Sequence, residues 1–172
     1  MNDFTQEVQE PKEQRAESQA AAWAIPSRDG GRRSQKCLSF GDRVIKLNDY
    51  LLEQESKKED ERCKKQKSGR IPITLKSVAN LSNQLLRAGT SIGANNAESI
   101  NAISKQDYRS KSFIALKEAR ESLYWINLLH RNKYLTNDEY NSIYADCEEL
   151  VKLLVVRCKK INEDLEKPEK KS

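Results

Sequence analysis

Apolar residues recur at intervals of three and four along most of the chain, which is the spacing that gathers side chains on one face of a helix. This pattern predicts a first helix over about residues 38–56 and a second from residue 73 or 74 to residues 97–100. A third helix should begin at Ser104 and a fourth at Thr136. The fourth has the most regular apolar stripe, formed by Tyr140, Ile143, Cys147, Leu150, Leu154, Cys158 and Ile161.

The starts of the last two helices carry capping signals. Thr136 is followed three residues later by Glu139, which is a full capping box, and Ser104 is followed by Asp107, which is a variant of it. Glycine and proline are few and lie mostly outside the periodic segments, which disfavours a turn-rich β fold. Because short segments join the last three helices, we expect an all-α fold: an antiparallel up-down-up-down four-helix bundle.

The ends of the chain and one internal segment lack this periodicity. We expect residues 1–35 to form a flexible N-terminal extension, residues 36–165 to form the bundle, and residues 166–172 to form a charged tail. Residues 55–70 form a charged insert, which either extends the first helix into solvent or forms a loop. Its second half is strongly basic, and we favour a solvated linker over an arm that contacts phosphate.

Two glycines, Gly89 and Gly93, lie four residues apart inside the second predicted helix. Each costs about 1 kcal/mol relative to alanine, so we expect them to permit close packing against another helix, within the bundle or across a subunit boundary. Arg87, Asn95 and Glu98 lie on or beside the same face. These three side chains either contact a partner residue on another helix or another subunit, or they are ordinary polar residues of the surface.

Composition excludes several classes of protein. The chain has no run of about 18 apolar residues, which a transmembrane helix would need, so we expect no membrane partner. The first residues lack the basic start and apolar centre of a secretory signal, so we expect a cytoplasmic protein. The cysteines Cys37, Cys63, Cys147 and Cys158 form no C-x-x-C pair, which argues against a metal or redox site. Cys147 and Cys158 should be buried thiols.

Catalytic patterns are also missing. The chain has one histidine, His130, which cannot supply the two Glu-x-x-His motifs of a di-iron bundle, and no glycine-rich phosphate loop is present. Glu118 and Glu121 have basic neighbours and should form surface ion pairs. We therefore expect no enzymatic activity, no cofactor, no metal and no small-molecule substrate.

Residues 84–95, together with Glu98, resemble the second-helix signature of the four-helix bundle proteins of the 23S rRNA-intervening-sequence family. The resemblance continues through residues 104–108, 115–125, 134–135 and 146–150, and covers most of the chain from Phe40 to Ile161. That family includes proteins encoded within insertions of bacterial 23S rRNA genes. It is similar to the accessory variability determinant of diversity-generating retroelements, a basic homopentamer that binds nucleic acid and a reverse transcriptase. The resemblance implies a bundle, a homopentamer and a nucleic-acid-associated role without catalytic residues.

The net charge of +5 is compatible with such a role. Our first hypothesis is an oligomeric bundle that binds nucleic acid, with RNA as the expected partner. The candidate contacts are Lys64, Lys65, Lys67 and Arg70 on the insert and Lys105, Arg109 and Lys111 on the third helix. The second hypothesis is a protein-interaction scaffold, such as an accessory subunit of a reverse transcriptase, for which the small-residue face and the chain ends would matter most.

Overall fold

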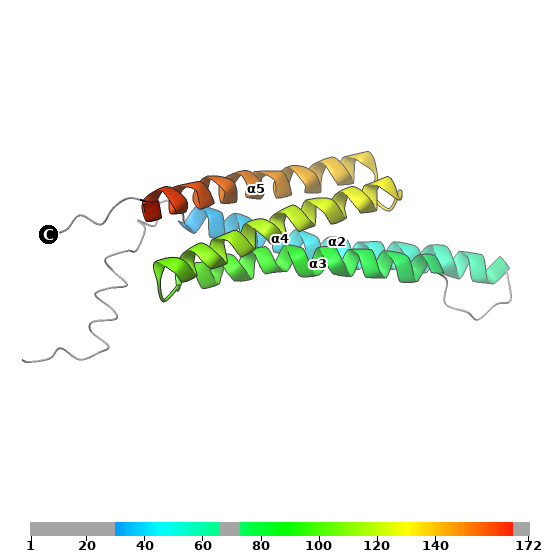
Figure 1. The fold of residues 1–172 in the computed structure, drawn as a ribbon. Coiled ribbons are helices and arrows are strands. Elements are labelled where there is room, and N and C mark those ends of the chain that lie inside the picture. Colours follow the sequence, from blue (N-terminus) through cyan, green and yellow to red (C-terminus); the bar gives the residue numbers. More distant parts are fainter. Residues whose placement is uncertain (1–29, 66–72, 167–172) are drawn as a thin grey trace, which may run out of the picture.

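A computed structural model describes residues 30–65 and 73–166, and these residues form four helices without strands (Figure 1). Helix α2 spans Gly30–Lys65, α3 spans Ile73–Ile100, α4 spans Lys105–Arg131 and α5 spans Asn137–Glu166. Consecutive helices run antiparallel and pack side by side, so the predicted all-α four-helix bundle is confirmed.

Three of the four helix starts agree with the predictions. Helix α3 begins at Ile73, and the Ser104 hydroxyl caps α4 by accepting a bond from the Asp107 backbone N–H at 3.1 Å. The carboxylate of Glu139 accepts a bond from the Thr136 backbone N–H at 2.8 Å, while the Thr136 hydroxyl accepts from the Glu139 N–H at 3.3 Å. This reciprocal pair is the capping box that the sequence predicted at the start of α5.

The first helix is longer at both ends than the predicted 38–56. It begins at Gly30, so residues 30–35, which we had assigned to the extension, are helical, and it continues through most of the charged insert to Lys65. Ion pairs between helical neighbours, Lys57–Glu53 and Lys58–Glu55, accompany this charged end and favour the helix. The rest of the predicted extension, insert and tail (residues 1–29, 66–72 and 167–172) lies outside the described residues.

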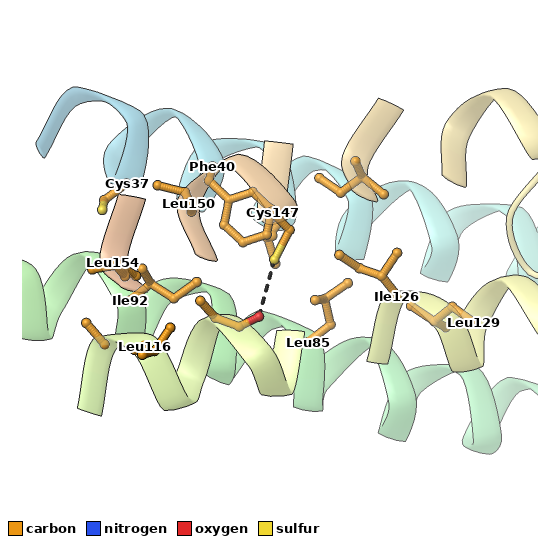
Figure 2. Packing of buried hydrophobic residues seen from close by; sticks show 14 of the residues in the cluster. Cys37, Phe40, Leu85, Ile92, Leu116, Ile126, Leu129, Cys147, Leu150 and Leu154 are labelled. Carbon is orange, nitrogen blue, oxygen red and sulfur yellow. Dashed lines mark hydrogen bonds between the residues drawn. The ribbon is translucent and has the colours of Figure 1, made fainter. Parts of the chain in front are cut away.

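The core is a single cluster to which every helix contributes. Figure 2 shows Phe40 of α2, Leu85 of α3, Ile126 of α4 and Leu150 of α5 pointing into it, and each is almost fully buried. The predicted stripe of α5 faces this core along its whole length, from the half-buried Tyr140 to the buried Ile161. Periodicity therefore placed the inward faces correctly.

The seam between α2 and α5 is the sparsest contact between neighbouring helices, and polar side chains bridge it. Lys36 of α2 pairs with Glu149 of α5 at 2.6 Å, and Arg43 pairs with Asp146 and also donates to the Ser142 hydroxyl. The last turns of α2 and the first turns of α3 project past the turn that joins α4 to α5 (Figure 1). No helix in the described segments combines the length and apolar content that crossing a membrane requires.

Candidate nucleic-acid interface

The exposed face of α4 combines cations with aromatic rings. Its residues recur every three or four positions and so share one side of the helix, away from the buried Ala115, Ala119 and Ile126. This α4 basic face consists of Lys105, Arg109, Phe113, Lys117, Arg120 and Tyr124. Tyr124 is 57% exposed. Cations that contact phosphates, alternating with rings on which bases stack, are typical of surfaces that bind single-stranded nucleic acid.

A groove of about 420 Å³ lies between this face and α5. Its floor is apolar, made by the half-buried Phe113 and Val155 and the buried Leu116 and Cys158. Its polar lining residues are Lys117, Arg120, Lys159 and Asn162, and the three cations among them are exposed. None of the lining residues is acidic, so the groove offers apolar contact and positive charge together.

Arg109 is held at the edge of this groove. Its Nε donates to Oδ1 of Asn162 at 3.0 Å, and its guanidinium carbon lies 5.1 Å from the centroid of the Phe113 ring. Burial raises the pKa of the Cys158 thiol on the floor, while Arg157, Arg109 and Arg120 act in the opposite direction. Three guanidinium groups therefore place positive charge near the Cys158 thiol.

The structure separates the cations that the sequence grouped as nucleic-acid contacts. Lys105 and Arg109 lie on the α4 basic face. Lys111 does not, because it pairs with Glu98 of α3, a hydrogen bond and attraction that raise the pKa of the Lys111 ammonium group. Lys64 and Lys65 lie in the last turn of α2, at the opposite end of the bundle from Lys105 (Figure 1), and Lys67 and Arg70 lie outside the described residues.

Both glycines of α3 face α2 within the same chain. A Cβ atom on Gly89 would lie 3.0 Å from Cγ2 and 3.2 Å from Cγ1 of Val44, which is closer than carbon atoms normally approach. A Cβ atom on Gly93 would lie 3.8 Å from the carbonyl oxygen of Cys37, an ordinary contact distance. The packing of α3 on α2 therefore requires a glycine at position 89 but not at position 93.

The polar residues near these glycines have different partners. Glu98 pairs with Lys111 on the neighbouring helix, as the interpretation of a cross-helix partner requires. Asn95 instead donates from Nδ2 to the carbonyl of Ser91 in its own helix at 2.9 Å, and Arg87 is exposed on α3. The three residues do not converge on one site.

A buried polar cluster, which the sequence reasoning missed, joins the four helices at one end. Arg157 of α5 is only 5% exposed, and its guanidinium donates to the Tyr108 hydroxyl at 3.0 Å, to Oδ1 of Asn96 at 2.8 Å and to the Ser99 hydroxyl. Asn96 in turn donates from Nδ2 to the Ser34 hydroxyl of α2 at 3.1 Å. Burial lowers the pKa of Arg157, and neutral oxygen acceptors replace the water that burial removed.

The three cysteine thiols that the structure describes are buried, and burial lowers their reactivity. Cys37, Cys147 and Cys158 are free and inaccessible, and the Cys147 thiol donates to the carbonyl of Ala119 at 3.4 Å (Figure 2). Burial raises the pKa of Cys147 to about 12, so the thiol stays protonated at neutral pH. Cys63 lies in the part of α2 whose side chains are not described.

His130 and Glu121 make contacts with neighbouring side chains that hold the fold together. The His130 ring stacks on Tyr140 with centroids 4.1 Å apart and shares a hydrogen bond of 2.9 Å with Asn137, across the turn between α4 and α5. Glu121 accepts a bond from the Trp125 indole N–H. Within residues 30–65 and 73–166, no group of three or more His, Cys, Asp or Glu side chains could hold a metal ion.

Comparisons with known proteins agree on one family. The sequence profile of the 23S rRNA-intervening sequence protein matches residues 72–156. Among solved structures, the chain is similar to a protein of unknown function from the S23 ribosomal protein family of Bacteroides thetaiotaomicron. The two are 35% identical, the match covers 76% of this chain and 97% of the other, and the TM-score is 0.61. No curated protein matches the chain.

Proposed function

Because the chain belongs to the 23S rRNA-intervening sequence protein family, we propose that it is a non-catalytic, oligomeric bundle of the cytoplasm that binds nucleic acid, with RNA as the partner. The observation that carries this proposal is the α4 basic face and the groove beside it. The family assignment alone does not supply a binding surface, whereas this face offers several exposed cations in one stripe.

The exposed cations around the groove have no ion-pair partner among the described residues, which supports the proposal. Within the described segments, Lys117, Arg120 and Lys159 take part in no ion pair, unlike Lys36, Arg43 and Lys111, which are paired with carboxylates. Exposed cations without a carboxylate partner are free to release counterions and to contact phosphates. Phe113 precedes and Tyr124 follows Lys117 and Arg120 on the same side of α4, so bases could stack beside these cations.

We propose further that the chain forms a homopentamer. Leu38 and Ile45 of α2 are 62% and 44% exposed and lie seven residues apart, on one side of the helix. Exposed apolar side chains arranged in this way favour contact with another protein surface. Assembly would also multiply the positive charge of each chain. Multi-angle light scattering tests this directly, since a monomer at micromolar concentration would refute it.

Binding to RNA is tested by fluorescence anisotropy with a labelled structured RNA and a labelled single strand of equal length. We expect binding in low salt that weakens steeply as salt is raised, because phosphate contacts release counterions. Absence of binding to both RNAs in low salt would refute the proposal. A multiple-turnover nuclease assay on the same RNAs tests the non-catalytic part, and we expect the RNA to stay intact.

The exposed apolar pair on α2 also supports a second candidate function, a scaffold that assists another protein such as a reverse transcriptase. The expected partner would be recovered in a pull-down by the wild-type chain and lost when Leu38 and Ile45 are both replaced by serine. Recovery of a polymerase without any affinity for RNA would favour this second function over the first.

A further inference from the structure

We propose that the groove between α4 and α5 is a docking site for the acidic segment of this same chain, residues 3–10. The inference goes beyond nucleic-acid binding and does not depend on it, since the contact is intramolecular and involves no RNA. It rests on the chemistry of the groove, on the sequence of the segment and on where α2 begins.

The groove and the segment are complementary in charge and in apolar content. The groove presents Lys117, Arg120 and Lys159 around its apolar floor of Phe113, Leu116, Val155 and Cys158. Residues 3–10 read Asp-Phe-Thr-Gln-Glu-Val-Gln-Glu, with three acids and no base. Phe4 and Val8 are four residues apart, so in a helical turn both would lie on one side, and Asp3, Glu7 and Glu10 would all lie along one flank of that side. The acids can thus meet cations at the rim of the groove while the two apolar side chains cover its floor.

The segment is within reach of the groove. Helix α2 begins at Gly30, and Arg33 in its first turn lies close enough to Arg157 for the two charges to influence each other. Cys158, the next residue, lines the groove. Nineteen residues separate Glu10 from Gly30. They would span about 24 Å as a random coil and about 60 Å when extended. Tethering of this kind gives effective concentrations in the millimolar range, so a weak contact suffices.

The other parts of the chain that lie outside the described residues have the wrong chemistry for the groove. Residues 66–72 carry two bases and no acid, and residues 167–172 carry three lysines and one glutamate. Residues 11–29 mix acids with bases, among them Lys12, Arg15 and Arg28. Residues 3–10 combine three acids with apolar side chains and carry no base, whereas residues 16–27, which also lack a base, carry a single acid, Glu17.

The test uses the full chain, labelled with ¹⁵N, without RNA. The test variant neutralises the segment (Asp3→Asn, Glu7→Gln and Glu10→Gln), and its matched control makes the same change in charge farther along (Glu13→Gln, Glu17→Gln and Asp29→Asn). A third variant neutralises the groove (Lys117→Gln, Arg120→Gln and Lys159→Gln). Two readings are taken: the amide linewidths of residues 3–10, and the amide shifts of residues lining the groove.

In the wild type and the matched control, we expect the amides of residues 3–10 to be broader than those of residues 13–28. Neutralising either the segment or the groove should sharpen them to the same narrow width, and segment neutralisation should shift the groove amides. Narrow lines for residues 3–10 in the wild type would overturn the proposal. Groove shifts that depend on protein concentration would assign the groove to a second copy and would overturn the proposal as well.

Discussion

Replacing each of the two α3 glycines with alanine should have opposite effects on stability. The intrinsic gain is the same at both positions, because alanine is better than glycine in a helix by about 1 kcal/mol. The surroundings differ. At Gly89 the new methyl group would lie 3.0 Å from the buried Val44 side chain, whereas at Gly93 its nearest neighbour would be 3.8 Å away.

The magnitudes follow from these distances. Overpacking a core by one methyl group costs about 1–3 kcal/mol, and Val44 is fully buried and branched at Cβ, so it has little freedom to move aside. Subtracting the helix gain leaves Gly89→Ala less stable than the wild type by about 0–2 kcal/mol. Gly93→Ala meets only ordinary contacts and should be more stable by up to about 1 kcal/mol.

Urea unfolding followed by far-ultraviolet circular dichroism, at one fixed protein concentration, measures both changes. The double variant Gly89→Ala with Val44→Ala tests the cause, because removing the Val44 methyl groups should relieve the clash and make the two changes less costly together than their sum. The reasoning is refuted if Gly89→Ala is as stable as Gly93→Ala, or if the two changes are additive. The bulkier Gly93→Leu should still disrupt folding or assembly.

Three further predictions concern the core and the caps. Arg157→Ala should lower the free energy of unfolding by about 2–4 kcal/mol, measured in urea, since it leaves the buried acceptor of Asn96 and the hydroxyl of Ser99 without their donor. The pKa of Cys147 in the folded state is raised to about 12. The buried, protonated thiol therefore makes its full contribution to the free energy of unfolding below pH 9, and this contribution is lost as the pH rises toward 12. Unfolding free energies measured from pH 8 to 11 should fall less in Cys147→Ala than in the wild type. Thr136→Ala should cost about 1 kcal/mol through the lost cap, whereas Thr90→Ala, on an exposed helical surface, should cost less.

The helices were predictable because their signals are local. Each inward stripe follows a period of three and four, and the caps at Ser104 and Thr136 lie within three residues of their partners. The extent of α2 was not predictable in this way. Its first turns are held by contacts with distant residues, such as the bond of Ser34 with Asn96 and the pairing of Lys36 with Glu149, and its charged end has no apolar stripe to reveal it.

The candidate surface was only partly visible in the sequence. Lys105 and Arg109 were singled out, but Lys117, Arg120 and Lys159 were not, since nothing local shows that α4 and α5 enclose a groove. Arg157 did leave a signal, because it lies between Leu154 and Cys158 at an inward position of α5 where a charge is unusual. Lys111 pairs with Glu98 on another helix, and nothing local in the sequence shows this contact.

The salt dependence of RNA binding tests the α4–α5 surface most directly. For a single-stranded RNA, the slope of log K against log salt is about −0.7 per phosphate contact. The variant Lys117→Gln with Arg120→Gln should therefore reduce the steepness by about 1.4, whereas Lys46→Gln with Lys76→Gln, which removes the same charge from exposed positions of α2 and α3, should leave it unchanged. Equal slopes for the two variants would contradict the assignment of the binding surface to α4 and α5.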